Sequence, residues 1–234
     1  MRSYCSLVLS LSLALLLSGC GQTRAEDFAC NTGMRDAPDL DIEAFASGYF
    51  PPSYSEADIP VCGDLLVPRI SEVESEWYPG QWSAACEPSF WQLSEAPTHP
   101  DFALRFSLIP SFEPSVFIQV FSSGESHRLI VKEMSGAGGY EPGYIWRSRE
   151  RVLTTVQVSE LKRMIESERF FGPTAIDPDD GVLEDGCSFG FDGSQWIFER
   201  VDENGYAMVQ HWSPNEGAAK ELGEYLIDLT GWEF

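Results

Sequence analysis

The segment Phe102-Ala103-Leu104-Arg105-Phe106-Ser107-Leu108 decides the fold of this chain. Its large apolar side chains occupy every second position and alternate with smaller or polar residues. Because side chains of a strand point alternately to opposite faces of a sheet, this period of two predicts a half-buried β-strand. A regular sheet therefore begins close to residue 101.

The chain beyond this segment predicts further strands. Residues 116–121 and 127–133 predict a hairpin with a five-residue loop, and residues 144–153 predict a fourth strand. Two more strands are predicted on either side of Asn204-Gly205, a pair typical of a two-residue type I′ turn. In that register Glu199 faces Gln210, and its side chain lies on the opposite face of the sheet from His211.

Two amphipathic helices complete this region. The first follows Thr154, which has the capping-box spacing with Gln157. The second follows Ser213 as N-cap, with Glu216 completing a capping box, and ends at Gly231. Their apolar positions are Val158, Leu161 and Ile165 in the first helix, and Ala219, Leu222, Leu226 and Leu229 in the second. The order of strands, helix, strands, helix favours an α+β domain over 101–234, an antiparallel sheet with two helices on one face.

Three blocks of this region carry a resemblance. They are Ser-Gly-Ala-Gly-Gly-Tyr-Glu-Pro-Gly at 135–143, Asp-Gly-Ser-Gln-Trp-Ile-Phe-Glu at 192–199, and His-Trp-Ser-Pro at 211–214. Residues 106–231 resemble a group of uncharacterised bacterial proteins that share these blocks. The resemblance supports the domain boundary and implies no catalytic residue.

Residues 30–100 have a different composition, because more than half of the 15 prolines of the chain lie there. Proline lacks a backbone donor and disfavours helix at the residue before it. We therefore expect an irregular segment with short helical pieces only at 40–45 and 70–77.

Four cysteines lie outside the N-terminal leader: Cys30, Cys62, Cys86 and Cys187. An even number of cysteines in an exported chain predicts two disulfides, which would staple the irregular segment. Three pairings are possible, and the spacing does not choose among them. No Cys-x-x-Cys motif or histidine cluster accompanies these cysteines, so we expect no zinc site.

Residues 1–19 have the pattern of a secretory signal peptide. Arg2 precedes an apolar run over 7–17 that is too short for a membrane span. Leu17-Ser18-Gly19-Cys20 resembles the lipobox of bacterial lipoproteins, which implies lipidation of Cys20 (palmitate among the acyl chains) and stable membrane anchoring. Gly21, in place of an aspartate, implies the outer membrane. Residues 20–29 would then be a polar tether.

The charge of the chain is strongly negative. It has 37 acidic and 15 basic residues, a formal net charge of −22. Such a surface repels nucleic acid and anionic lipid headgroups, so we expect no nucleic-acid partner. Besides the membrane, reached through the lipid anchor, the charge favours a cationic protein or peptide as partner. The alternative is that the charge serves solubility alone.

Several patterns invite a catalytic or binding interpretation. Residues 186–190 have Gly-x-Ser-x-Gly spacing without a following helix, the acidic cluster at 177–185 departs from EF-hand spacing, and 135–143 lacks a phosphate-loop ending. We therefore assign no catalytic residue, no metal ligand and no cofactor. In the glycine-rich loop, Gly138-Gly139 predicts a tight turn that Tyr140 and Pro142 pack down.

An arginine stripe is the strongest binding candidate. Arg147, Arg149 and Arg151 lie two residues apart, so on a strand they share one face, next to Trp146. Guanidinium groups bind carboxylates and phosphates in bidentate fashion, which favours an anion or an acidic partner. The alternative is pairing with carboxylates of the same chain.

The leading hypothesis is a lipid-anchored protein-binding or inhibitor-like module of the cell envelope. It rests on the lipobox, the negative charge and the predicted disulfides. The alternative is an envelope enzyme acting on cell-wall material, with Ser188, Glu199 or His211 as reacting groups.

Overall fold

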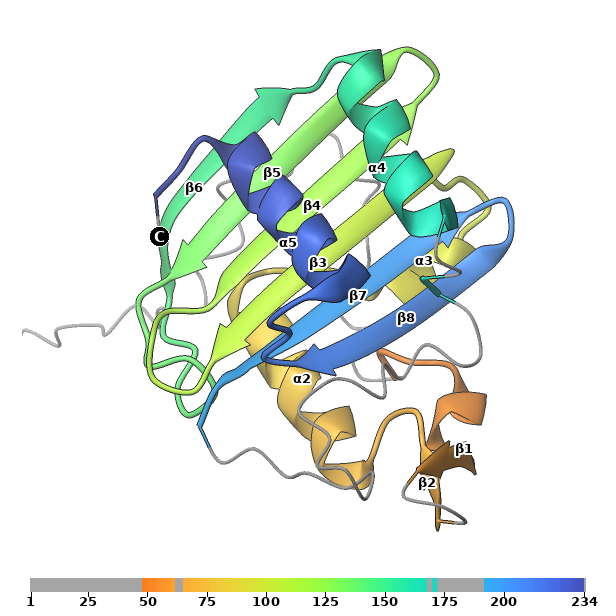
Figure 1. Ribbon diagram of the computed structural model, residues 1–234, viewed down its shortest axis with the longest axis vertical. Coiled ribbons are helices and arrows are strands. Elements are labelled where there is room, and N and C mark those ends of the chain that lie inside the picture. The colour runs from red at the N-terminus through yellow and green to blue at the C-terminus, as the bar shows by residue number, and fades with distance from the viewer. Residues whose placement is uncertain (1–47, 62–64, 168–169, 172–191, 234) are drawn as a thin grey trace, which may run out of the picture.

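The fold is a six-stranded antiparallel sheet with helices on both faces (Figure 1). The computed structural model describes residues 48–61, 65–167, 170–171 and 192–233. The strands are β3 (Phe102–Pro110), β4 (Val116–Ser123), β5 (Ser126–Met134), β6 (Ile145–Val152), β7 (Ser194–Asp202) and β8 (Gly205–Trp212). The predicted α+β class and antiparallel sheet are confirmed.

Strand β3 lies in the middle of the sheet. The order is β6-β5-β4-β3-β7-β8, because the C-terminal hairpin pairs with β3 rather than with β6. Phe102, Leu104 and Phe106 pack beneath helices on one face, whereas Arg105 and Ser107 are fully buried on the other. The prediction of a half-buried strand was therefore wrong, since this strand is covered on both faces.

The structure differs from the sequence prediction at both predicted hairpin turns, β4–β5 and β7–β8. The β4–β5 loop has two residues, because Ser123 pairs with Ser126. At the β7–β8 turn Asp202 pairs with Gly205, and the Asn204 N–H donates to Asp202 Oδ1 at 2.8 Å. Among the described residues of that turn only Gly205 has positive φ, which excludes type I′. The register shifts by two residues, so each side chain keeps its predicted face.

Helices α4 (Thr155–Ser167) and α5 (Gly217–Thr230) cover one face of the sheet (Figure 1). The capping box before α4 is present, with the Gln157 N–H donating to Thr154 Oγ1 at 3.2 Å and the Thr154 N–H to Gln157 Oε1 at 2.9 Å. The predicted apolar positions of both helices are buried, and Gly231 is the left-handed C-cap of α5.

Helix α5 starts later than its sequence predicts. Its N-cap is Glu216, which makes no side-chain capping hydrogen bond. Ser213, the predicted N-cap, instead has a left-handed backbone, and its Oγ accepts a hydrogen bond from the Ser194 N–H at 2.8 Å. Ser213 therefore closes the end of the β7–β8 hairpin rather than the helix.

The two predicted helices, α4 and α5, lie on one face, and the described residues between 48 and 100, which the sequence predicted to be mainly irregular, cover the opposite face with further helices (Figure 1). This segment contains the 3-10 helix η2 (Pro52–Ser55), the hairpin β1 (Ala57–Val61) with β2 (Leu65–Pro68), and helices α2 (Glu72–Ala84) and α3 (Phe90–Glu95). The predicted helical piece at 70–77 corresponds to the first half of α2. The piece predicted at 40–45 lies outside the described residues.

Helix α2 forms although Pro79 lies inside it. A capping box starts it, in which the Glu74 N–H donates to Ser71 Oγ and the Ser71 N–H to Glu74 Oε2. Tyr78 and Trp82 are fully buried against the sheet. Large buried aromatic area outweighs the helix-breaking cost of about 3 kcal/mol expected for an interior proline.

Within the described part of the chain, no helix is both long enough and apolar enough to cross a membrane.

Candidate functional site

The arginine stripe of β6 lies against the C-terminal end of α5. Arg149 Nη1 donates to the Thr230 carbonyl at 3.5 Å, and Arg151 Nη1 donates to the Leu229 carbonyl. Because the last carbonyls of a helix lack intrahelical partners and carry partial negative charge, these cations satisfy and stabilise that end of α5. The three arginines share one face and remain exposed, and each of them contacts a group of the protein itself.

Arg147 makes a mixed set of internal contacts. Its Nε donates to a carboxylate oxygen of Glu133, and its guanidinium lies 4.2 Å from the ring centroid of Trp232. Arg149 also approaches that ring, at 5.7 Å. The ion pair with Glu133 is the kind of contact that the alternative interpretation of the stripe predicted. Binding of an external anion by these arginines remains a prediction.

Glu199 and His211 lie on opposite faces of the sheet, as their sequence positions predicted. His211 packs beneath the α4–α5 layer, with its ring 6.0 Å from that of Phe170 and 6.3 Å from that of Phe198. Glu199 is fully buried on the α2–α3 side. The two side chains cannot act on one substrate, because the sheet separates them.

Glu199 belongs to a buried ionic cluster that sequence reasoning missed. Arg105 Nε donates to Glu199 Oε2 at 2.6 Å, and the Tyr206 hydroxyl donates to Glu199 Oε1 at 2.9 Å. The second half of the cluster is Glu87, whose carboxylate lies 2.8 Å from Lys132 Nζ and 3.7 Å from Arg105 Nη1. Two cations thus face two carboxylates in a closed layer.

Helices α2 and α3 seal this cluster from solvent. The Arg105 guanidinium lies between two rings, 4.3 Å from the centroid of Trp82 and 4.5 Å from that of Phe90. Burial raises the pKa of Glu199, against the opposing influence of Arg105. Burial also raises the pKa of Tyr206 well above its usual range. Glu87, Arg105 and Glu199 are fully buried among the described residues, and their ion pairs join the segment that contains α2 and α3 to the sheet.

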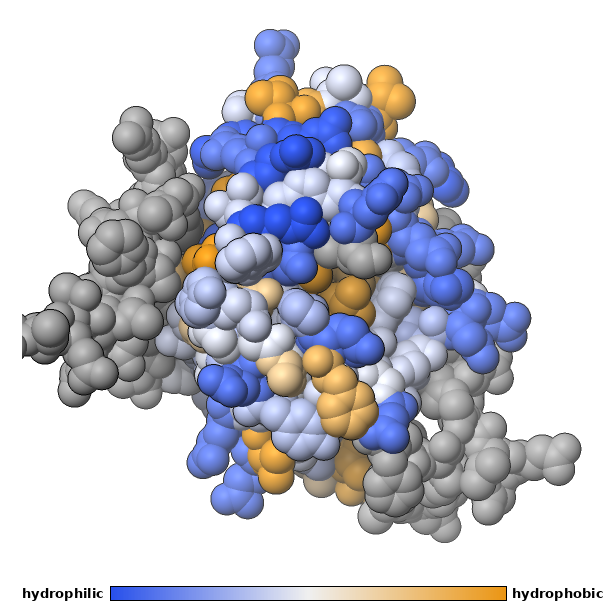
Figure 2. Space-filling model, turned by 90° about the vertical axis from the view of Figure 1, so that its left-hand side faces the viewer, coloured by the Kyte–Doolittle hydropathy of each residue, from blue (hydrophilic) through white to orange (hydrophobic). Residues whose placement is uncertain are grey.

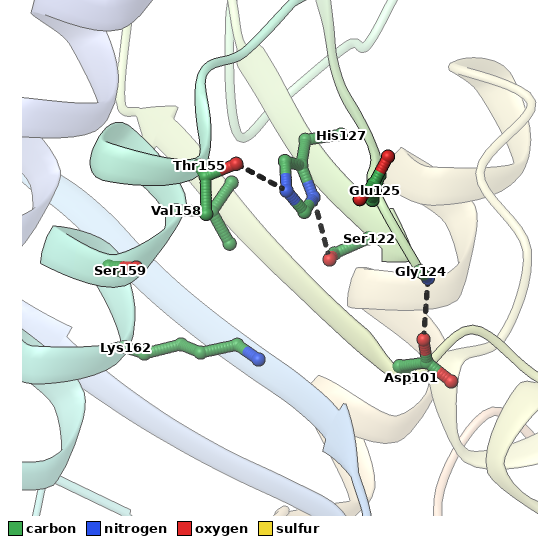
Figure 3. A pocket seen from close by; sticks show the side chains of 9 residues that line it. All are labelled: Asp101, Ser122, Gly124, Glu125, His127, Thr155, Val158, Ser159 and Lys162. Atoms are coloured by element: carbon green, nitrogen blue, oxygen red, sulfur yellow. Dashed lines mark hydrogen bonds between the residues drawn. The ribbon is translucent and has the colours of Figure 1, made fainter.

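A pocket of about 540 Å³ lies between the β4–β5 hairpin and α4 (Figure 3). Ser122 Oγ and His127 Nδ1 are 2.8 Å apart across the hairpin, and His127 Nε2 is 3.4 Å from Thr155 Oγ1. Asp101 accepts from the Gly124 N–H at 2.7 Å and fixes the turn. The remaining lining residues are Glu125, Val158, Ser159 and Lys162.

The pocket is lined mainly by polar side chains, among them the Ser122–His127 pair. A serine beside a histidine is one half of a nucleophilic pair, but activation also needs a group that orients the histidine and donors for a developing oxyanion. Here His127 contacts hydroxyls on both ring nitrogens, and the Gly124 N–H is engaged by Asp101. The residues described here therefore assemble a hydrogen-bonded hairpin end rather than a catalytic site.

The glycine-rich loop between β5 and β6 presents an aromatic pair. Tyr140 stacks on Phe112 of the β3–β4 connection, with ring centroids 5.8 Å apart and planes 17° apart. Tyr140 is 76% exposed and Phe112 is 59% exposed. The expectation that Tyr140 packs the loop down was wrong, because close backbone contacts of the glycines hold the loop instead. Exposed apolar side chains interrupt the hydrophilic surface on this side of the molecule (Figure 2).

Several predicted positions lie outside the described residues: Cys20, Cys30, Cys62, Cys187, Ser188 and the acidic cluster 177–185. Cys86 is described, and its backbone has a left-handed φ of 53° just after α2. The two disulfides remain a prediction. Among the described residues, no group of histidine, cysteine or carboxylate side chains is arranged to hold a metal ion.

Comparison with known proteins adds no relative. No protein-family model matches the chain, and no curated protein matches it either.

Proposed function

We propose that this chain is an exported protein, lipid-anchored at Cys20 in the cell envelope, that binds cationic proteins or peptides. The sequence features that support export and anchoring are the signal peptide at 1–19 and the lipobox. The absence of aspartate after Cys20 supports the outer membrane. Two disulfides among Cys30, Cys62, Cys86 and Cys187 belong to the same proposal, since exported chains keep disulfides.

The observation that carries the binding proposal is that the described lysine and arginine side chains contact groups of the protein itself. Every lysine and arginine that the structure describes contacts a carboxylate, a backbone carbonyl or an aromatic ring of the protein. Arg105 and Lys132 are buried, Arg149 and Arg151 contact carbonyls of α5, and Lys162 lies over the ring of Phe102. The others contact Met208 O (Arg69), Glu150 (Arg128), Glu133 (Arg147), Glu160 (Arg163), Asp202 (Arg200) and Glu224 (Lys220).

Acidic side chains, by contrast, are plentiful at the surface. The exposed ones include Glu72, Glu76, Glu113, Glu125, Glu141, Glu203 and Glu221. Several cations are exposed as well, among them Arg147, Arg151 and Arg163, but the formal charge of the chain is −22, so the outward field is negative. Such a field attracts a cationic partner over a long range and raises the rate at which the two proteins meet.

Salt dependence of binding tests this proposal. The mature protein, purified from membranes in a neutral detergent, is titrated with a lysozyme as a basic folded probe and with an acidic protein of similar size as control. We expect the affinity for the basic probe to fall at least about tenfold between about 25 mM and 500 mM salt, because the Debye length shortens. An affinity that does not change with salt, or equal binding of the acidic control, would contradict the proposal.

The anchor and the disulfides are checked on the same preparation. Mass spectrometry of the N-terminal peptide should find a diacylated or triacylated Cys20, and non-reduced digests should contain two disulfide-linked peptide pairs. An intact leader, or an unmodified thiol at residue 20, would overturn the proposed location.

A further inference from the structure

Two aromatic side chains are exposed together at the tips of two different connections. Phe112 belongs to the β3–β4 connection and Tyr140 to the β5–β6 loop, and their rings stack. The two connections lie side by side, because the Gly139 N–H donates to the Pro110 carbonyl at 2.8 Å. Stacked rings that remain exposed are a typical composition of a contact surface, in which aromatic residues supply the central binding energy.

The support beneath the pair is rigid. A Cβ added at Gly138 would lie 1.9 Å from the Pro110 carbonyl oxygen, so the two backbones are in direct contact there. From α2, Trp77 Nε1 donates to the Gly139 carbonyl at 2.8 Å and Gln81 Nε2 donates to the Gly138 carbonyl at 3.1 Å. A partner that binds the rings therefore meets a preorganised surface and pays little ordering entropy.

The charge next to the rings selects the kind of partner. Each ring is followed in sequence by an exposed carboxylate, Glu113 after Phe112 and Glu141 after Tyr140. The face of an aromatic ring attracts a cation, and a nearby carboxylate adds an ion pair to the same cation. A lysine or arginine side chain satisfies both groups, whereas a second copy of this acidic chain would be repelled.

We infer that Phe112, Glu113, Tyr140 and Glu141, here called the aromatic–acidic surface, receive lysine or arginine side chains of a cationic protein. This inference rests on the proposed function and adds the place on the molecule where binding occurs. The negative field of the whole protein brings the partner near, and this surface makes the contact.

Three variants of the full mature chain test the inference, with a lysozyme as probe, and a fourth variant serves as control. Phe112→Ala combined with Tyr140→Ala should weaken binding at least about tenfold, the loss typical of central aromatic contacts. Phe112→Leu combined with Tyr140→Leu keeps apolar area but removes the ring faces, and should weaken binding by a similar factor. Glu113→Gln combined with Glu141→Gln should weaken binding by about threefold at low salt and reduce the salt dependence.

The matched control removes a charge and an apolar side chain elsewhere. Glu203→Gln combined with Val156→Ala changes an exposed carboxylate at the β7–β8 turn and a 78% exposed valine on α4. Glu203 lies at the opposite end of β7 from Ser194, which pairs with Pro110 beside the aromatic–acidic surface. The control should bind within about twofold of wild type, and thermal unfolding should verify that all variants fold.

The outcomes separate the inference from the proposed function. If wild type binds the lysozyme with the expected salt dependence and the Phe112 and Tyr140 variants bind equally well, the inference is overturned and the proposed function stands. If the Leu variants bind like wild type and the Ala variants do not, the contact is apolar and the cationic assignment is overturned. If wild type binds no basic probe, both fail, and if it self-associates through this surface, the inference alone is overturned.

Discussion

Both faces of the central sheet bury apolar side chains, but the face under α2 and α3, here called the polar face, also buries a cluster of charged groups. Under α4 and α5 the buried side chains are almost all apolar, from Phe102 and Leu104 in β3 to Leu222 and Leu226 in α5. Under α2 and α3 the same strand contributes Arg105 to a buried cluster, which also contains Lys132 and the carboxylates of Glu87 and Glu199. The face under α4 and α5, here called the apolar face, is thus held mainly by hydrophobic packing, whereas the polar face combines hydrophobic packing with buried ion pairs.

The difference teaches how residues 48–100 are held in place. An apolar interface tolerates exchange of one hydrophobic side chain for another of similar volume, so it sets few constraints on register. A buried ionic layer is favourable only when every charge finds its partner, so a shifted or absent N-terminal layer would leave Arg105 and Lys132 uncompensated. The polar face therefore specifies one docking arrangement, and the apolar face supplies much of the burial.

The most severe test of this contrast removes one charge from the polar face. Glu199→Ala leaves the fully buried Arg105 without its closest carboxylate and removes the acceptor of Tyr206. We expect it to lower the free energy of unfolding by about 3–5 kcal/mol, measured by urea denaturation. A loss below about 1 kcal/mol would mean that Arg105 does not depend on Glu199 as its buried partner.

Leu226→Ala in α5 is the matched control on the apolar face. It should cost about 2–5 kcal/mol through lost burial and a cavity. Glu199→Met tests the difference between the two faces further. If only the volume of the side chain mattered, an apolar residue of similar size would restore the stability lost in Glu199→Ala. At position 199 we expect no rescue, because the buried guanidinium still lacks its carboxylate.

Alkaline pH should weaken the polar face selectively. Burial raises the pKa of Tyr78 and Tyr206 well above 10, so the folded state keeps their protons where the unfolded chain loses them. Their contribution to stability is complete below pH 10 and decreases as pH rises further. The expected slope is about 1.4 kcal/mol per pH unit above 10 for each tyrosine, measured by urea denaturation between pH 8 and about 11.5.

Tyr78→Phe should reduce this slope, whereas replacing the partly exposed Tyr225 in α5 should change it less. A slope that is the same in wild type and Tyr78→Phe would show that alkaline sensitivity arises elsewhere in the protein.

The smallest expected effect compares the helix caps of the two layers. Ser71→Ala removes the capping box of α2 on the polar face, and Thr154→Ala removes that of α4 on the apolar face. Each should cost about 1 kcal/mol, because a cap satisfies one or two orphan N–H groups whatever covers the helix. Equal losses would show that the two faces differ in their interface rather than in helix formation. Clearly different losses of unfolding free energy would show that the contribution of a helix cap depends on the interface that the helix covers.

Local patterns predicted the part of the fold that depends on local physics. Alternation identified β3, the hairpin pattern at 116–133 identified β4 and β5, and the segment 144–153 corresponds to β6. The spacing of Val158, Leu161 and Ile165 identified α4. The opposite facing of Glu199 and His211 was also predicted, because a register shift of two residues does not change faces. The start of α5 was wrong because Ser213 bonds to the neighbouring strand rather than to the helix.

Non-local features could not be predicted. The place of β7 beside β3, and hence the burial of Arg105, depends on contacts between residues almost a hundred positions apart. Helix α2 was underestimated because Pro79 outweighed the capping pair Ser71 and Glu74, which was visible in the sequence. The Ser122–His127 contact was missed because Ser122 was placed in a five-residue loop before a strand that starts at His127. The two-residue turn makes the two residues cross-strand partners.

Helix α5 crosses the sheet from β7, where Gly223 lies against Trp196, to β6, where its last carbonyls meet Arg149 and Arg151 (Figure 1). The final turn of α5 therefore holds β6, an edge strand of the sheet. A chain truncated within α5 would lose these carbonyl acceptors, so Arg149 and Arg151 would no longer tie β6 to the helix layer.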